Sequence, residues 1–157
     1  MTPRIWLAEP GEAGTVARLL TAFRDWMGRD SPSDDVLLAS VERLIGQPSV
    51  EYLLGAPDER SPAAGVAQLR YRFGVWWAAE DCWLEDLFVS EEARGSGLGR
   101  ALTLAAFDRA RARGCRRVEL DVNTENPPAL KLYESLGFTT GKLGGQDLLM
   151  RRHLDDG

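Results

Sequence analysis

The sequence is poor in the residues from which proteins build metal centres and disulfide frameworks. It contains one histidine and two cysteines, Cys82 and Cys115, among 157 residues. Two cysteines can form one bridge at most, and disulfide-rich frameworks belong to secreted domains, so we predict a protein of the reducing cytoplasm. A single Cys82–Cys115 bridge stays open as an alternative. Zinc sites are built mainly from cysteine and histidine ligands, so we expect no metal site.

Long hydrophobic runs are also missing. No apolar stretch approaches the ~18–20 residues that a membrane-spanning helix needs, and Met1–Trp6 shows no signal-peptide core, so we expect no membrane partner. Hydrophobic residues make up 44% and charged residues 27% of the chain, values typical of globular proteins, which argues against disorder. A chain of this length forms about one domain, so residues 1–157 are expected to fold as one domain without metals or disulfides.

Positive charge is scarce overall but concentrated in one segment. The net charge of −5 is unfavourable for a nucleic-acid-binding protein, so we expect no nucleic-acid partner. Residues 94–117 nevertheless contain seven arginines and one acid, Asp108, a net charge of +6, so the rest of the chain carries −11. We interpret this segment as a region that binds an anion. The alternative is a solvated helix face whose arginines contribute only to solubility.

Helix and strand patterns alternate along the chain without repeats or linkers. Apolar residues at helical spacing predict four helices, and short apolar runs between turn residues predict seven strands. Helices are expected over residues 16–27, from a cap at Asp34 or Asp35 to Ile45, from Leu98 to Gly114 and from Pro127 to Gly137, and strands over residues 4–10, 50–55, 64–73, 82–90, 117–122, 138–141 and 147–152. A hairpin is the simplest connection between the second and third strands. The pattern therefore predicts one α/β domain.

A glycine-rich stretch, Arg94-Gly95-Ser96-Gly97-Leu98-Gly99-Arg100, follows a predicted strand and opens the long helix. Glycines let the backbone approach a ligand closely. The first turn of a helix offers unpaired N–H groups and the positive end of the helix dipole, which together favour a phosphate. The stretch fits neither a Walker loop nor the dinucleotide fingerprint, because the residues at their defining positions differ. On its own, a tight strand-to-helix turn explains the stretch equally well.

A second pattern lies downstream, in residues 126–138. Together the two patterns resemble the GNAT superfamily of acyl-CoA-dependent N-acyltransferases. Arg94, Gly97 and Gly99 match the family pattern Arg/Gln-x-x-Gly-x-Gly/Ala. The pattern Asn-x-x-Ala-x-x-x-Tyr-x-x-x-Gly-Phe is matched by Asn126, Ala129, Tyr133, Gly137 and Phe138. The resemblance is strong over residues 82–140, and it implies a GNAT-like fold, a central mixed, mostly antiparallel sheet flanked by helices.

The resemblance also implies that acetyl-CoA is the co-substrate. The backbone of residues 94–99 is then expected to hold the pyrophosphate, and the strand before it the pantetheine arm, in a slot where this strand splays away from residues 117–122. Arg94 and Arg100 flank the loop and are the arginines expected at the phosphates. Asn126 is expected either to contact the cofactor or only to cap a helix. The full set of predicted cofactor-binding residues is Phe88, Val89, Arg94, Gly95, Ser96, Gly97, Leu98, Gly99, Arg100 and Asn126.

Acyl transfer to an amine needs a base for the amine, a donor for the carbonyl oxygen and an acid for the leaving thiolate. Tyr133 occupies the family's position for the acid, with a core tyrosine as the alternative. Glu85 is our candidate base, with its neighbour Asp86 as the alternative, because Glu85 interrupts an apolar strand where an unpaired acid is costly to bury. Asp86 is expected on the opposite face, since side chains alternate along a strand. The alternative role of Glu85 is a salt bridge to Arg70 or Arg72.

Acidic residues gather where the resemblance places the acceptor. Asp34 and Asp35 lie in the first helix–loop–helix, Asp86 lies on the strand, and Trp26 is interleaved with them. Carboxylates and aromatic faces attract ammonium groups. We therefore predict that these four residues bind the acceptor, a small cationic amine. Ordinary loop and capping roles are the alternative.

The predicted activity is the transfer of an acetyl group from acetyl-CoA to a primary amine. Three other functions stay open. The chain could be a catalytically silent module that senses acyl-CoA, an acetyltransferase of protein N-termini or lysines, or a binder of nucleotide phosphates for which ATP would compete. Many members of the family are homodimers, so a homodimer is expected here as well.

Overall fold

The computed structural model describes residues 2–142 and 144–155, and the chain divides into two compact units. The first unit spans Met1–Leu120 and the second Asp121–Gly157. We describe each unit by itself. The first carries the glycine-rich stretch and the candidate base, and the second carries the candidate acid.

A five-stranded sheet forms the centre of the first unit. Its strands follow each other in the order β1–β2–β3–β4–β5, and every neighbouring pair is antiparallel except β4 and β5, which are parallel. The expected mixed, mostly antiparallel sheet flanked by helices is therefore confirmed. The strand bounds are β1 Arg4–Leu7, β2 Val50–Ala56, β3 Gly65–Gly74, β4 Ala79–Val89 and β5 Val118–Glu119.

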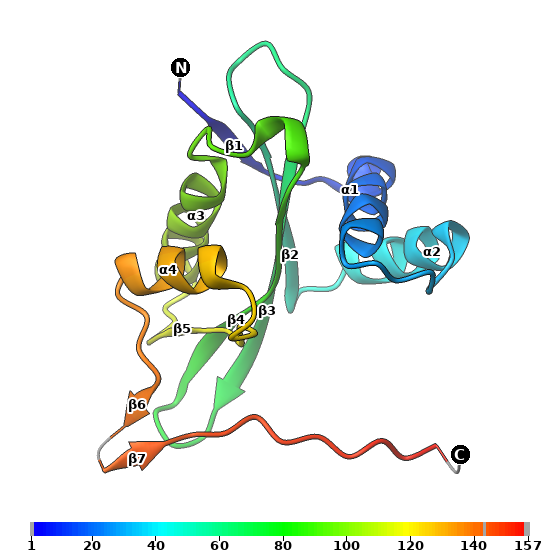
Figure 1. The fold of residues 1–157 in the computed structure, drawn as a ribbon. Coiled ribbons are helices and arrows are strands. Elements are labelled where there is room, and N and C mark those ends of the chain that lie inside the picture. Colours follow the sequence, from blue (N-terminus) through cyan, green and yellow to red (C-terminus); the bar gives the residue numbers. More distant parts are fainter. Residues whose placement is uncertain (1, 143, 156–157) are drawn as a thin grey trace. The chain divides into compact units, whose positions relative to one another are not determined.

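Helices cover both faces of this sheet. The helices α1, Ala13–Trp26, and α2, Asp34–Ile45, lie on one face, and α3, Leu98–Ala112, lies on the other (Figure 1). Short 3-10 turns at Pro10–Glu12 and Glu91–Ala93 lead into α1 and toward α3. Each helix carries an apolar stripe that it buries against the sheet, as its 3.6-residue spacing requires.

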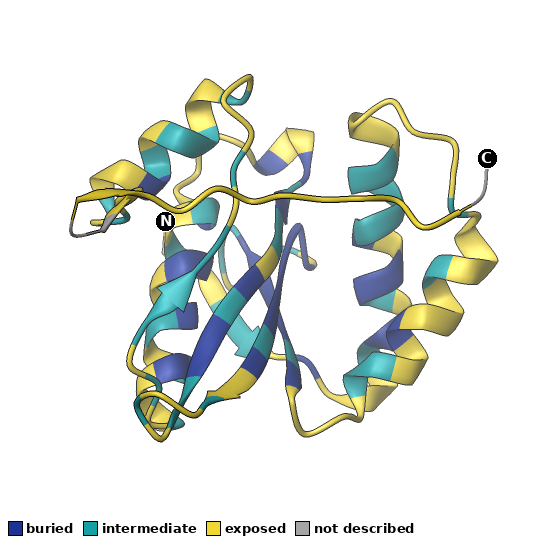
Figure 2. Cartoon of the chain, turned by 90° about the horizontal axis from the view of Figure 1, so that it is seen from below, coloured by how far each residue is buried: buried dark blue, intermediate teal, exposed yellow. Residues whose placement is uncertain are grey.

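The core consists of two layers that share the sheet. Alternate residues of β2, β3 and β4 face α1 and α2, among them Tyr52, Leu54, Val66 and Phe88, and all four are at most 5% exposed. Figure 2 shows that the buried residues follow these central strands and the sides of the helices that face them. On the other face, Gly55 and Gly65 make room for α3. A Cβ atom on either glycine would approach the side chains of Leu98 or Leu102 to 2.8–3.0 Å.

Ion pairs attach α3 to the strands beneath it. The Arg109 guanidinium binds the Glu51 carboxylate of β2 through two hydrogen bonds, and the Tyr71 hydroxyl donates to the same carboxylate at 2.5 Å. Arg113 lies 3.7 Å over the Tyr71 ring and pairs with Glu80 of β4 at 3.1 Å. Arg109 in α3 and Arg113 directly after it therefore have partners in the sheet, whereas the sequence had suggested solvation or a bound anion for this segment.

The second unit contains α4, Pro127–Ser135, and two short antiparallel strands, β6 Gly141–Lys142 and β7 Gly145–Gln146. The Asn126 side chain caps α4 by accepting a hydrogen bond from the Ala129 N–H at 3.4 Å. Pro127 and Pro128 occupy the first turn, where their missing N–H groups would have no partner in the helix. The capping role proposed for Asn126 is therefore confirmed.

Several expected boundaries are wrong. Residues 138–140 and 147–152 form no strand, and β5 covers two residues instead of 117–122. The first strand ends at Leu7 instead of Pro10, and a 3-10 turn begins at Pro10. Ser33, and not Asp34 or Asp35, caps α2 by accepting a bond from the Val36 N–H at 3.3 Å. Both cysteines are free thiols. No helix within the described residues is long and apolar enough to cross a bilayer.

Candidate active site

The glycine-rich stretch forms a tight turn that leads directly into α3. Gly95 and Gly97 have φ angles of +80° and +83°, a region that favours glycine, and Gly97 is the N-cap of the helix. A Cβ atom on either residue would meet no protein atom within 4 Å, so both glycines face open space. The Ser96 hydroxyl donates to the Ala93 carbonyl at 2.5 Å and thereby braces the turn. The first N–H groups of α3 have no partner within the helix and can receive an anion.

The strand before this turn has an open edge. β4 pairs with β5 only at Cys82–Val118 and Trp83–Glu119, so within the described residues no strand covers that edge beyond Trp83. Backbone groups alternate between the two edges of a strand. The Cys82 N–H bonds to the Arg117 carbonyl on this edge, and the pairing with β3 places the N–H and C=O groups of Leu87 and Val89 on it too. The predicted slot beside β4 is thus lined by backbone donors and acceptors.

Arg94 connects the glycine-rich turn to the end of α1. Its Nε donates to the Val89 carbonyl at 3.1 Å, and its guanidinium lies 4.9 Å from the centre of the Trp26 ring and 5.8 Å from that of Phe88. Phe88 in turn stacks on Phe23 of α1, with ring centres 5.0 Å apart and planes inclined by 15°. Phe88 therefore has its side chain in the core, and by the same alternation its N–H and C=O groups face β3, so of the two predicted strand residues Val89, and not Phe88, presents its backbone to the open edge. Arg100 is exposed in the first turn of α3.

The candidate base lies at an irregularity of the sheet. Gln68 pairs with Asp86 and Leu69 with Leu84, so Glu85 is an extra residue in β4 and forms a β-bulge. Asp86 lines a pocket against α1, and Glu85 bonds to side chains of β3 on the same face. The expectation that Asp86 points to the opposite face is therefore wrong, because the bulge interrupts the two-residue alternation.

Two side chains of β3 hold the Glu85 carboxylate. Arg70 Nε donates to Glu85 Oε2 at 2.5 Å, and Gln68 Nε2 donates to the same oxygen at 2.7 Å. The salt bridge to Arg70, our alternative for Glu85, is thus present. Among the hydrogen bonds of the described residues, both bonds to Glu85 reach Oε2 and leave Oε1 for a water molecule or an ammonium group. Sequence reasoning missed Gln68, because its contact depends on how the strands pair.

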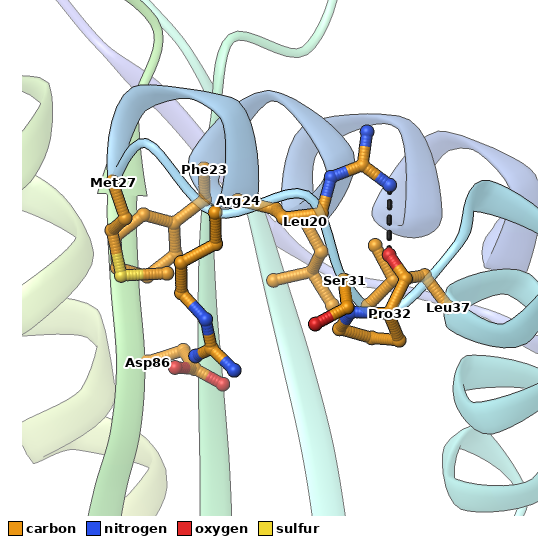
Figure 3. Close-up of a pocket in the computed structure, with 9 residues that line it drawn as sticks. Leu20, Phe23, Arg24, Met27, Ser31, Pro32, Leu37 and Asp86 are labelled. Carbon is orange, nitrogen blue, oxygen red and sulfur yellow. Dashed lines mark hydrogen bonds between the residues drawn. The ribbon is translucent and has the colours of Figure 1, made fainter.

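A small pocket of about 130 Å³ lies between α1, α2 and β4, beside the candidate base. Most of its wall is apolar, and its charged residues are Arg24, Arg29 and Asp86. Figure 3 shows the Asp86 carboxylate below the Phe23 ring and Met27, with Ser31, Pro32 and Leu37 on the other side. The described residues that line it are Leu20, Phe23, Arg24, Met27, Arg29, Ser31, Pro32, Leu37 and Asp86.

Only one of the four predicted acceptor-binding residues lines this pocket. Asp86 does, whereas Trp26, Asp34 and Asp35 are absent from the lining. The Arg24 guanidinium binds Asp34 at 2.7 Å, Asp25 at 2.8 Å and the Pro32 carbonyl at 2.8 Å, so Asp34 is engaged in an ion pair beside the pocket. Phe23, Met27 and Arg29 were missed, because the helical pattern places residues on a face without showing which of them surround a cavity.

The candidate acid lies on α4 in the second unit. Tyr133 is 8% exposed, and its ring contacts the Phe138 ring edge-on at 5.6 Å. Burial, with a smaller contribution from the charge of Asp121, raises the pKa of Tyr133 to about 12. The phenol therefore stays protonated throughout the neutral range and can donate a hydrogen bond.

Comparisons with known proteins give one consistent result. A profile of the acetyltransferase (GNAT) family matches residues 16–138. Mycothiol acetyltransferase of Thermobispora bispora is 50% identical over 64 residues, which are 41% of this chain and 21% of that protein. Thialysine N-epsilon-acetyltransferase of Bos taurus is 29% identical over 140 residues, which are 83% of this chain and 80% of that protein. The matches to mycothiol acetyltransferases span only 15–23% of the length of four such relatives.

A solved structure agrees over nearly the whole chain. It is that of a protein from Arthrobacter sp. FB24, provisionally assigned as an acetyltransferase, with a TM-score of 0.82 and 31% sequence identity. The match covers 99% of this chain and 96% of that protein. The family profile includes the glycine-rich turn, the bulged strand and α4. The chain belongs to the acetyltransferase (GNAT) family.

Proposed function

We propose that this protein transfers an acetyl group from acetyl-CoA to the primary amine of a small molecule. The observation that carries the proposal is the open edge of β4, which ends in a turn with two glycines of positive φ at the N-terminus of α3. Membership of the acetyltransferase (GNAT) family supports the same activity. The cytoplasmic location and the homodimer stay predictions.

The residues around this edge fit the chemistry of acetyl-CoA. The turn at 95–99 and the first N–H groups of α3 would hold the pyrophosphate, and Arg94 and Arg100 would neutralise its charge. Leu87 offers its N–H and C=O groups and Val89 its N–H to the amide-containing pantetheine arm, which can pair with them as a further strand would, while the Val89 carbonyl accepts from Arg94 Nε. When bound, this co-substrate supplies the acetyl group as an activated thioester.

On the acceptor side, Asp86 and Glu85 have different roles. Asp86 in the pocket attracts the ammonium form of the acceptor. Glu85 Oε1 then accepts the amine proton, directly or through one water molecule, while Gln68 and Arg70 hold the carboxylate by Oε2. The neutral amine forms the new C–N bond to the acetyl carbon as the C–S bond breaks, and the second proton that the nitrogen must then lose passes to solvent. A backbone N–H on the β4 edge serves as donor to the carbonyl oxygen on which negative charge develops.

Tyr133 serves the leaving group. A thiol has a reference pKa of about 8.5, so complete proton transfer to the thiolate from a phenol with a pKa of about 12 is uphill. We therefore assign Tyr133 the role of a hydrogen-bond donor that stabilises the thiolate as the C–S bond breaks. Solvent completes the protonation of the thiolate after it has left.

The experiment that tests the proposal measures CoA thiol release from acetyl-CoA over a panel of small amines. We expect turnover with at least one amine, and a decrease in kcat/KM of about 10²–10³-fold in Glu85→Gln, because the base is lost. Glu42→Gln, an exposed acid on α2, is the matched control and should retain wild-type turnover. The affinity for CoA, measured by calorimetry, should be the same in all three proteins.

Each alternative function predicts a different result. A silent sensor of acyl-CoA would bind CoA without releasing thiol for any amine. An acetyltransferase of protein N-termini or lysines would turn over peptides and leave free amines unchanged. A binder of nucleotide phosphates would be competed by ATP and not by CoA. Wild-type turnover in Glu85→Gln would reduce Glu85 to its structural role as partner of Arg70.

A further inference from the structure

The sheet face that carries Glu85 continues beyond the pocket and beyond the helices that cover it. Along β3, the side chains on this face change from buried at Gln68, through half-buried at Arg70, to exposed at Arg72. Gln68 and Arg70 both bond to Glu85, which shows that they share its face. The hairpin end of β3 and β4 extends past α1 and α2 (Figure 1). Within the first unit, the helix layer on this face therefore ends near Glu85.

Trp83 is the residue of β4 that lies on this uncovered part of the face. It pairs directly with Arg70 of β3, and directly paired residues of an antiparallel sheet point their side chains to the same side. Its β4 neighbours Cys82 and Leu84 belong to the opposite face and are at most 3% exposed, whereas Trp83 is half-buried. Because Arg70 and Glu119 flank its backbone from β3 and β5, the exposed part of Trp83 belongs to its indole. An aromatic ring is thus accessible on the same face as the candidate base.

Polar side chains form a rim around this indole. Arg70 binds Glu85, and on the side of β5 Arg117 binds Asp81 at 3.2 Å and Glu119 at 3.4 Å. The strand register and the ion pairs place three arginines and three acids on this face around the ring, namely Arg70, Arg72, Arg117, Asp81, Glu85 and Glu119. Their charges cancel in sum, so the apolar ring is the feature that distinguishes this strip. A flat ring placed against the indole fits such a surface.

The spacing along β4 sets the length of a ligand that reaches both the base and the ring. Trp83 and Glu85 are two residues apart, and two residues of a strand span about 6.6 Å. In a molecule whose amine is joined to a flat ring by two methylene groups, the nitrogen lies about 5 Å from the ring centre, at ~1.5 Å per bond. An amine held at Glu85 therefore brings such a ring over the indole.

We propose that the acceptor is an arylalkylamine, a primary amine on a short arm attached to an aromatic ring, and that Trp83 selects it by stacking on that ring. The amine lies at Glu85, and Asp86 in the pocket attracts its ammonium form. The ring displaces water from the indole, and stacking of two aromatic rings adds to the affinity beyond the area that is buried. This inference rests on the proposed acetyl transfer and specifies its acceptor. Trp83 is then a specificity-determining residue that contacts the acceptor away from the reacting atoms.

Two amines with the same arm and the same number of carbon atoms test it. Phenethylamine carries an aromatic ring, and cyclohexylethylamine carries a puckered, saturated one. We expect kcat/KM for phenethylamine to exceed that for cyclohexylethylamine about three- to tenfold, the range typical of one aromatic pair. In Trp83→Leu the ratio should fall to about one or below, through the loss of activity toward phenethylamine, whereas Trp83→Phe should keep most of it. Phe73→Leu is the control, because Phe73 is 65% exposed on the opposite face of β3, and it should keep the wild-type ratio.

Two kinds of result would overturn the inference. Equal kcat/KM for the two amines in the wild type, or an unchanged ratio in folded Trp83→Leu, would show that no ring stacks on Trp83. A preference for cadaverine or glucosamine over phenethylamine, with the same dependence on Trp83, would show that the indole binds a second ammonium group or a sugar instead. Calorimetric titration of the amines into CoA-saturated wild-type protein gives the comparison without turnover and without a variant. Failure of acetyl transfer with every amine would thus refute the proposed activity, while the binding ratio still decides the inference.

Discussion

Tyr133 combines burial with a hydroxyl that keeps its proton. Its ring packs edge-on against Phe138, and its pKa of about 12 lies far above the neutral range. A buried phenol of this kind is also compatible with a purely structural role. The structural role and the role as donor to the leaving thiolate differ only in whether the hydroxyl is needed. Replacement of the hydroxyl alone separates them.

We predict that Tyr133→Phe lowers kcat by about 10²–10⁴-fold, because the leaving thiolate loses its donor. The phenyl ring preserves the contact with Phe138, so the melting temperature should stay near that of the wild type. Steady-state kinetics and calorimetric CoA titration measure the two effects, and the CoA affinity should not change. Since the pKa is about 12, no decline of kcat from ionisation of Tyr133 should appear below pH 10. Undiminished turnover in the variant would show that Tyr133 has only a structural role.

At the scale of elements, the turn before α3 has a counterpart at the end of the same helix. Gly97 at the start and Gly114 just after the end have φ angles of +83° and +79°, and a Cβ on either would meet nothing within 4 Å. An alanine at either position costs about 1–2 kcal/mol of stability, because L-residues disfavour this conformation. The two glycines therefore form a matched pair, of which only Gly97 belongs to the proposed pyrophosphate site.

We predict that Gly97→Ala and Gly114→Ala lower the melting temperature by similar amounts, but that only Gly97→Ala weakens CoA binding, by at least about tenfold. In Gly97→Ala the new methyl group enters the open space in which the ligand would approach the backbone. Thermal unfolding and calorimetric titration with CoA provide the two readings. Equal CoA affinity in the two folded variants would exclude the turn as the site of the pyrophosphate.

The end of α1 is joined to the cofactor turn through Arg94 and three aromatic rings. Arg94 lies over Trp26 at 4.9 Å, and Phe23, which lines the acceptor pocket, lies 6.2 Å from Trp26 and 5.0 Å from Phe88. A cation over an aromatic ring contributes about 0.5–1 kcal/mol at an exposed site. This contact supports the wall of the acceptor pocket from the side of the cofactor.

We therefore predict that Trp26→Ala raises KM for the acceptor several-fold while the affinity for CoA stays the same. Trp76→Ala is the control, because Trp76 is 86% exposed on the turn between β3 and β4, and the rings under Arg94 among the described residues are those of Trp26 and Phe88. Initial-rate kinetics with varied acceptor at saturating acetyl-CoA measure the effect. If the two tryptophan variants have the same KM for the acceptor, the contact between Arg94 and Trp26 does not contribute to acceptor binding.

Helices and their order are well predicted from this sequence, and strand partners are not. Asn126, Pro127 and Gly137 mark the ends of α4 by local chemistry that one residue can carry. The bulge at Glu85 and the two-residue length of β5 depend on which strand lies beside which, and that information is absent from any single segment. The prediction of the sheet face on which Asp86 lies was wrong for this reason, because side chains alternate between the faces only while the register is unbroken.

In the first unit, three of the seven arginines in the segment 94–117 neutralise acids of the sheet. Arg109, Arg113 and Arg117 pair with Glu51, Glu80 and Asp81 of the sheet. Composition predicted an anion site from the local excess of arginine, but three of the seven arginines pair with acids that are distant in sequence. The arginines at the start of the segment, Arg94 and Arg100, lie at the glycine-rich turn. They are the two that the sequence had suggested for the phosphates.

The same buried network makes stability sensitive to alkaline pH. Burial raises the pKa of Cys82 from 9.0 to about 12 and that of Tyr52 from 10.0 to about 12. Burial, together with the Glu51 carboxylate, also raises the pKa of Tyr71. Above pH 9–10 the unfolded chain loses these protons while the folded chain keeps them. Because the folded state then binds more protons, its stability is fully present below pH 9 and falls as the pH rises toward 12.

We predict that the free energy of unfolding decreases by about 1.4 kcal/mol per pH unit for each such group once it is ionised in the unfolded chain. Urea unfolding at constant ionic strength, at pH 7, 8, 9, 10 and 11, measures the slope. Cys82→Ala removes one titrating group, so its curve should be shallower than that of the wild type between pH 9 and 11, even though the variant is less stable at pH 7. Parallel curves for the two proteins would mean that the Cys82 thiol ionises equally in both states and that the interior of the sheet admits its charge.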